Sequence, residues 1–142
     1  MNDTQGLIRS MVNAVQLCRS LAQDGWETAA EASLRDLIDQ FLRELDGIES
    51  SIIIRGTSLG LHFDGLPPYT HYLKRVKNRV SLHFKNSDSA AAECIIRCTM
   101  DCIIKISRSK HAVAEADPVT EQLFQHVLGC LNASIRHFRA YL

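Results

Sequence analysis

The residues best suited to chemistry in this chain are cysteines and histidines that recur at helical spacing. Two rows of them are present: Cys94, Cys98 and Cys102 in one, and His126, Cys130 and His137 in the other. Thiolate and imidazole are the ligands that Zn(II) and Cu(I) prefer. The rows therefore raise the possibility of a soft-metal site, provided that the helices carrying them bring the two rows together.

The relative orientation of the two rows decides this hypothesis, and the sequence leaves it open. On neighbouring antiparallel helices the rows either both face each other or both face away. If they face each other, Cys98 and Cys102 would lie level with Cys130 and His126. The simpler interpretation, which we favour, is that cysteine acts as a small buried hydrophobe and widens an apolar face. Cys18 lies in the middle of another apolar stripe and is predicted to be plain core.

The same residues give little support for catalysis. A reactive cysteine needs a neighbouring base or cation, whereas a thiol among isoleucines has its pKa raised. The sequence has no glycine-rich phosphate loop and no paired inward carboxylates. We therefore expect neither an enzyme nor a bound cofactor.

Apolar residues at intervals of three and four predict the elements that must position these side chains. The predicted helices cover about residues 4–30, 33–55, 88–108 and 118–141, with Ser33 and Asp117 as N-caps of the second and fourth. Residues 56–69 are rich in glycine and proline, which predicts a long crossover, and a weaker helix is expected at about 70–84. The expected fold is a single all-α domain, a four-helix bundle with a short extra helix between its second and third helices.

The end of the first predicted helix resembles a known family. Residues 24–31, DGWETAAE, are similar to the DGY..AAE segment of small bacterial ferritin-like bundle proteins of largely unassigned function. The resemblance implies a ferritin-like four-helix bundle. Ferritin-like proteins that hold two iron or manganese ions place a glutamate on each of two helices and Glu-x-x-His on the other two.

The chain departs from that di-metal pattern at the positions that matter. Glycine stands at Gly47, three residues after Glu44, and serine stands at Ser134, three residues before His137. Glu44 lies about 60° from the centre of its helix stripe and is expected to be half-buried, paired with an arginine such as Arg43 or Arg97. A di-iron centre is therefore disfavoured, and Glu44 and His137 remain only candidates for a residual Fe or Mn site.

Composition limits the remaining possibilities. The 142 residues have a formal net charge of zero, which suits one domain with an ordinary core. A local basic stretch offers candidates for a partner surface: Lys74, Arg75, Lys77 and Arg79. A solvated helix face explains this stretch better than a nucleic-acid site. The odd count of five cysteines and an N-terminus without leader character predict reduced thiols, a cytoplasmic location and no membrane partner.

Taken together, these features predict a non-enzymatic bundle that acts through its surface, as a homodimer or as a partner-binding module. The expected contact surfaces are the basic short helix and the broad apolar side of the third bundle helix, whose wide apolar arc needs cover from the short helix or from a second subunit. The alternative is a metal-binding bundle that uses the cysteine and histidine rows or a residual Fe/Mn site.

Overall fold

The protein is all-helical in the computed structural model, which describes residues 3–63, 87–113 and 115–142. Its elements are α1 (Asp3–Thr28), α2 (Ala32–Ser58), α4 (Asp88–His111), α5 (Pro118–Phe138) and the short 3-10 helix η1 (Arg139–Tyr141). The described ranges contain no strand, so the all-α prediction and the four long helices are confirmed. Most of the predicted crossover, the predicted helix at 70–84 and the basic residues Lys74, Arg75, Lys77 and Arg79 lie outside the described residues.

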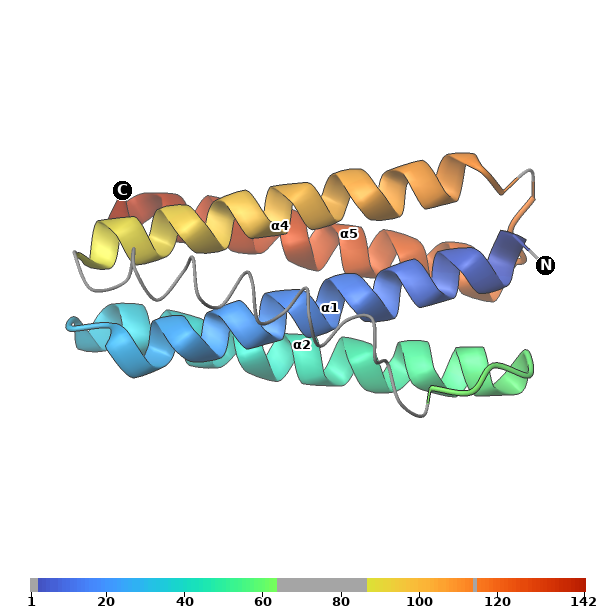
Figure 1. The fold of residues 1–142 in the computed structure, drawn as a ribbon, viewed down its shortest axis with the longest axis horizontal. Helices are drawn as coiled ribbons and strands as arrows, with labels where there is room; N and C mark the ends of the chain where they lie inside the picture. The colour runs from blue at the N-terminus through green and yellow to red at the C-terminus, as the bar shows by residue number, and fades with distance from the viewer. Residues whose placement is uncertain (1–2, 64–86, 114) are drawn as a thin grey trace.

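The four long helices lie side by side as a bundle (Figure 1). Each of the pairs α1–α2 and α4–α5 is antiparallel, whereas α2 and α4 run in the same direction (Figure 1). α1 packs against both α2 and α4, and α5 packs against α4 and more sparsely against α2. α1 and α5 are therefore diagonal partners, and two different interfaces, α1–α4 and α2–α5, join the first helix pair to the second.

The core is built from the apolar stripes that the sequence predicts. Leu34, Ile38, Phe41, Leu45, Ile48 and Ile52 of α2 are all buried, as are the corresponding positions of α1, α4 and α5. Burying a side chain of this size contributes about 1.5–3 kcal/mol each. The rings of Phe41 and Phe138 meet edge to face, with centroids 5.7 Å apart, and link α2 to the end of α5.

The start of α2 differs from the prediction. The helix begins at Ala32 with Glu31 as its N-cap, so Ser33 is not the cap, and no side chain of the cap residue accepts a hydrogen bond. The N–H groups just before the helix have a tertiary acceptor. The Asp88 carboxylate at the start of α4 accepts hydrogen bonds from the backbone N–H of Ala30 (2.9 Å) and of Glu31 (2.8 Å). This tertiary contact ties the α1–α2 turn to α4.

The end of α2 also differs, because the helix runs through Gly56 to Ser58 rather than ending at residue 55. Gly56 is buried, and a Cβ at this position would collide with the ring of Phe63. The glycine therefore serves close packing inside the helix and does not break it. The chain leaves the helix at Gly60, whose φ of +87° lies in the left-handed region that favours glycine.

The cap of α5 agrees with the prediction. Asp117 accepts a hydrogen bond from the backbone N–H of Thr120 (2.9 Å), and Pro118 occupies the first helical position. The other boundaries differ by two or three residues, with α1 ending at Thr28, α4 at His111 and α5 passing into η1 after Phe138. In the ranges that the structure describes, none of the helices combines the length and apolarity that crossing a membrane requires.

Candidate metal centre

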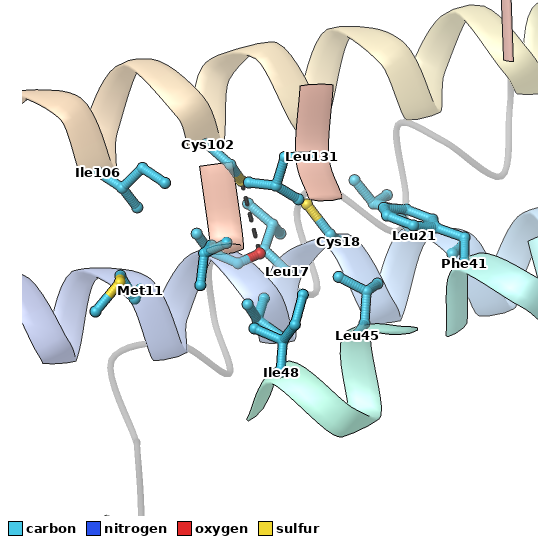
Figure 2. Packing of buried hydrophobic residues seen from close by; sticks show 14 of the residues in the cluster. Met11, Leu17, Cys18, Leu21, Phe41, Leu45, Ile48, Cys102, Ile106 and Leu131 are labelled. Carbon is cyan, nitrogen blue, oxygen red and sulfur yellow. Dashed lines mark hydrogen bonds between the residues drawn. The ribbon is translucent and has the colours of Figure 1, made fainter. Parts of the chain in front are cut away.

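Three thiols meet in the interface between α1 and α4. The Sγ atoms of Cys18, Cys98 and Cys102 all lie within 4.8 Å of one another. Cys98 and Cys102 are one turn apart on α4, and Cys18 is on the face of α1 that packs against them, as Figure 2 shows for Cys18 and Cys102. Within the described residues this is the only group of at least three histidine, cysteine or acidic side chains with ligand atoms so close together. We refer to these three residues as the trithiol cluster.

The trithiol cluster is enclosed by the core. Cys18 is 2% exposed and Cys102 is 1% exposed, while Cys98 is partly buried. Leu17, Leu21 and Leu131 surround the sulfurs in Figure 2. A site this apolar excludes the water that usually stabilises a thiolate, so an ionised sulfur here needs a partner of its own.

Two polar groups contact the cluster. The Cys102 S–H donates to the backbone carbonyl of Ala14 at 3.7 Å, the dashed line in Figure 2. The Cys18 Sγ lies 4.0 Å from the Thr99 Oγ1, whose hydroxyl donates to the Ile95 carbonyl at 2.7 Å. Both contacts hold the side chains in defined positions.

The three thiols differ in acidity because they hydrogen-bond one another. Hydrogen bonds with Cys102 and Cys98, together with burial, raise the pKa of Cys18 well above its usual range. The hydrogen bond with Cys102 is also the largest influence raising the pKa of Cys98. The pKa of Cys102 is lowered instead, because its sulfur accepts from Cys18 and Cys98 and because Lys105 is nearby.

The wide apolar arc of α4 is covered in part by α1. The predicted cover was the short helix at 70–84, which lies outside the described residues, or a second subunit, which stays a prediction. In the structure α1 packs against the flank that carries Cys98 and Cys102, through Ala14 and Cys18. The arc is wide because α4 contacts both α1 and α5.

The two predicted rows do not face each other. Cys98 and Cys102 face α1, whereas Cys130 faces α2, where its S–H donates to the Glu44 carboxylate at 3.4 Å. His126 is exposed on α5 and has no part in the trithiol cluster. The four-residue arrangement of Cys98, Cys102, His126 and Cys130 is therefore not formed.

The second row borders an open groove between α2 and α5. The groove has a volume of about 550 Å³. Its lining comes from both helices: Arg43, Glu44, Gly47, Ile48, Gln125, His126, Gly129, Cys130 and Ala133. A Cβ added at either Gly47 or Gly129 would meet no atom within 4 Å, so the two glycines leave the groove wide. Burial and the adjacent Glu44 carboxylate raise the pKa of Cys130 to about 12, which makes its thiol unreactive.

Glu44 is not half-buried, and no arginine of the described residues pairs with it, contrary to the prediction. It is exposed, and it accepts hydrogen bonds from Gln40 (3.4 Å) and Cys130. Arg43 pairs with Asp39 at 2.7 Å within α2. Likewise, Arg97 pairs with Glu93 at 2.6 Å within α4. Both arginines pair with the acidic residue one turn away, because that residue is within reach on the same helix.

A di-metal centre of the ferritin type does not fit the described residues. Glu44, Ser134 and His137 line one small crevice of about 10 Å³, which is at the lower limit for a single water molecule. Ser134 is 4% exposed and donates its hydroxyl to the Leu131 carbonyl at 2.7 Å, while Glu44 and His137 are exposed. These positions therefore do not offer an inward-facing set of carboxylates for two cations.

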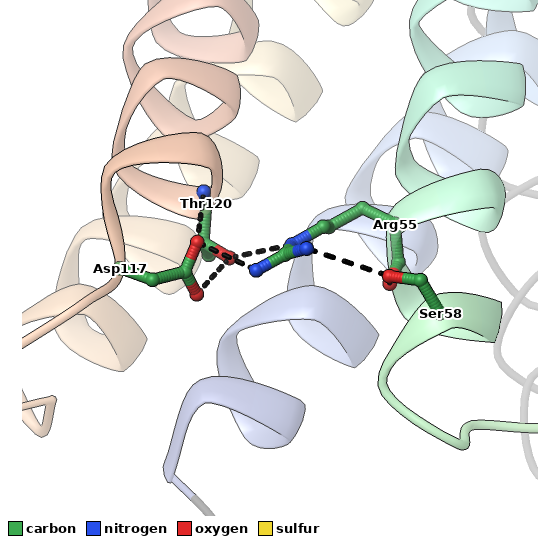
Figure 3. A network of polar contacts seen from close by, with 4 residues as sticks. All are labelled: Arg55, Ser58, Asp117 and Thr120. Atoms are coloured by element: carbon green, nitrogen blue, oxygen red, sulfur yellow. Dashed lines mark hydrogen bonds and ion pairs between the residues drawn. The ribbon is translucent and has the colours of Figure 1, made fainter.

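A polar network ties the far end of the α2–α5 interface. Arg55 of α2 forms an ion pair with Asp117 at 2.7 Å and donates to the Thr120 hydroxyl at 3.3 Å (Figure 3). Its guanidinium also donates to the Ser58 hydroxyl at 3.4 Å. The backbone N–H and hydroxyl of Thr120, together with Arg55, hold the pKa of Asp117 at about 2. The groove is therefore bordered by this network at one end and by the Phe41–Phe138 contact at the other.

Sequence reasoning missed Cys18 as a member of the cluster. Its place in the middle of an apolar stripe indicated core, and the structure does bury it there. The missing information was the neighbour of α1. Since α1 and α4 are antiparallel and Ala30 lies beside Asp88, counting back along both helices brings Cys18 level with the turn between Cys98 and Cys102. This register follows from the packing of α1 against α4, and the sequence did not specify that packing.

Comparison of the chain with family models, with curated proteins and with solved structures found no match. Functional inference therefore depends on the fold and on the side chains described above.

Proposed function

We propose that this protein is a helical bundle that binds one soft metal ion through Cys18, Cys98 and Cys102. The observation that carries the proposal is the mutual separation of the three Sγ atoms, none of which is more than 4.8 Å from another. Thiolate sulfur is the ligand type that Cu(I) and Zn(II) prefer. An ordinary core would gather three cysteines only by chance, whereas a binding site requires them from two helices at one level.

The bundle offers this cluster a rigid support. Cys98 and Cys102 are on one helix, and Cys18 is on another that packs along it closely. Ligands on packed helices keep their separation better than ligands on loops. The parallel course of α2 and α4 agrees with the ferritin-like resemblance, which we retain as a proposal for the topology. Binding through thiols requires them to be reduced, so we also propose that the protein works in a reducing compartment such as the cytoplasm.

Metal content after loading tests the proposed function. Reduced protein would be incubated with Cu(I) or Zn(II) without oxygen, desalted and analysed by mass spectrometry for metal and sulfur. We expect about one equivalent of a soft ion per chain. The Cys98→Ser variant should retain far less, and Cys130→Ser should match the wild type because Cys130 lies across the bundle. Retention below about a tenth of an equivalent with every ion would refute the proposal.

A second candidate function is the homodimer or partner-binding module predicted from the sequence. Met100 and Ile104 favour this candidate. Each side chain is 47% exposed, and the two lie one turn apart on α4, so they are next to each other on the surface. Exposed apolar side chains that are grouped together are the kind of surface that a partner can cover. Sedimentation would test this candidate. A mass near 32 kDa that falls to that of one chain in Met100→Lys/Ile104→Lys supports a dimer through this surface, and a wild-type monomer at high concentration contradicts it.

A further inference from the structure

We propose that the ion held by the trithiol cluster is Cu(I), coordinated by sulfur alone, and that the site excludes Zn(II). This inference depends on the metal-binding function proposed above and narrows it to one ion. The size of the sulfur triangle allows the cluster to close around one ion, and two features favour Cu(I): the described residues place no histidine or acidic side chain in the cluster, and two of its three thiols are buried in apolar surroundings.

The triangle of sulfurs is close to the size that an ion needs. For an ion in the plane of three sulfurs at about 2.3 Å from each, the sulfurs would be about 4.0 Å apart. The sulfurs of Cys18, Cys98 and Cys102 are separated by at most 4.8 Å. A contraction of less than about 1 Å per side, within the range of small side-chain rotations, would close the site without moving the helices.

A fourth ligand is not present among the described residues. Structural Zn(II) sites are closed by four ligands, and three-ligand Zn(II) sites keep a water in the fourth position. No histidine, aspartate or glutamate of the described ranges belongs to the cluster. Thr99, whose Oγ1 lies 4.0 Å from the Cys18 Sγ, is a neutral hydroxyl that already donates to the Ile95 carbonyl. Cu(I) forms complete complexes with two or three sulfurs, so it needs nothing that the site lacks.

The surroundings disfavour a water ligand as well. Cys18 and Cys102 are 2% and 1% exposed, and the apolar side chains of Leu17, Leu21 and Leu131 lie around them (Figure 2). A zinc-bound water there would have few partners for its hydrogen bonds, which is costly in an apolar site. The apolar packing therefore makes binding of Zn(II) less favourable, because Zn(II) needs a fourth ligand.

Protons and charge balance without any change in oxidation state. Cysteines bind an ion as thiolates, so loading of the site releases three thiol protons as three metal–sulfur bonds form. The product has a net charge of −1 with Zn(II) and of −2 with Cu(I), so charge does not favour Cu(I). The number of ligands is the feature that decides between the ions.

Competitive titration tests the inference. Reduced full-length protein would receive Cu(I) in the presence of a chromophoric Cu(I) chelator, and in parallel Zn(II) with a chromophoric zinc chelator. We expect one Cu(I) per chain held against its chelator, and no measurable removal of Zn(II) from a chelator of micromolar affinity. Cys98→Ser should weaken Cu(I) binding at least 100-fold. Cys130→Ser is the matched control and should bind Cu(I) like the wild type.

The outcomes separate the two proposals. If Zn(II) is bound as tightly as Cu(I) and Cys98→Ser loses both ions, the cluster is a metal site but the selectivity for Cu(I) is wrong. If neither ion is removed from its chelator, the metal-binding function itself is refuted. If Cys18→Ala fails to fold because its site is fully buried, Cys98→Ser still decides the question, since the Cys98 side chain is only partly buried.

Discussion

The α1–α4 and α2–α5 interfaces both contain cysteines, but the structural surroundings of these cysteines differ. At α1–α4, three thiols from two closely packed helices are enclosed in apolar core. At α2–α5, Cys130 borders an open groove, packs against the edge of the core and donates its S–H to the Glu44 carboxylate. The difference shows that the spacing of cysteines along one helix does not make a site. Whether cysteines form a site depends on the partner helix: on how closely it packs and on which residue lies opposite them.

Glycine content explains much of the contrast. Gly47 and Gly129 line the α2–α5 groove and leave space that no side chain fills. The interface is held instead at its two ends, by Arg55 with Asp117 and by the rings of Phe41 and Phe138. The α1–α4 interface packs the buried apolar residues of both helices into the core. One interface is therefore tight where its cysteines lie, and the other is open there.

The largest expected effect comes from removing matched isoleucines from the two interfaces. Ile106 is fully buried on α4, and Ile48, 3% exposed, lines the groove from α2. Ile106→Ala should lower the free energy of unfolding by about 4 kcal/mol and Ile48→Ala by about 2 kcal/mol, because a cavity open to the groove is filled at lower cost. Urea denaturation of both variants measures the difference. Equal losses would contradict the distinction between the interfaces.

The reactivity of Cys130 gives the next largest effect. Burial and Glu44 hold its pKa at about 12, so at pH 8 very little of it is thiolate. Alkylation by iodoacetamide should be at least about 100-fold slower than that of a free thiol and should rise about tenfold per pH unit from pH 8 to 11. Peptide mass spectrometry over time measures the rate. Glu44→Gln should speed the reaction, since it removes the neighbouring negative charge, and an unchanged rate would show that this carboxylate has no influence.

The acid response of the α2–α5 interface is smaller. The pKa of Asp117 is lowered to about 2 in the folded protein, below its value in an unfolded chain. The stabilisation it gives is therefore fully present above about pH 4 and is lost as pH falls towards 2. Asp117→Asn should lower the free energy of unfolding by about 1 kcal/mol at pH 7. This loss should shrink towards zero at pH 2, where the wild type no longer has the stabilisation either. Unfolding free energies at both pH values test this, with Asp39→Asn in an exposed pair as the control expected to cost under about 0.5 kcal/mol.

The smallest effect is a gain in stability from the groove. Gly129→Ala should raise the unfolding free energy by about 0.5–1 kcal/mol, because it improves helix propensity and meets no neighbouring atom. Gly56→Ala is the informative counterpart. It should be destabilising, since its Cβ would strike the Phe63 ring and approach Ile8 to 3.1 Å. Thermal denaturation of the two variants would show opposite shifts, and a loss from Gly129→Ala would mean that the groove is closed in solution.

The fold was more predictable from the sequence than the site. Apolar periodicity indicated all four long helices, and the Asp117-Pro118 pair marked the start of α5, because these signals are local. The start of α2 was not predictable in the same way, because the carboxylate that binds the turn before it, Asp88, is on another helix. The pairing of Cys18 with Cys98 and Cys102 depends on which helix lies beside α4, and the stripes on the helices do not specify their order. Gly56 was misread because its role is a tertiary contact rather than a turn.

X-ray absorption at the metal edge of the loaded protein tests the central claim most directly, because it counts the sulfurs around the ion. The account predicts three sulfur neighbours at about 2.3 Å and no nitrogen or oxygen ligand, with the same spectrum for Cys130→Ser. Cys98→Ser should lose the three-sulfur signature. An ion surrounded by nitrogen and oxygen, or a spectrum that changes in Cys130→Ser but not in Cys98→Ser, would contradict the assignment of the site to the α1–α4 interface.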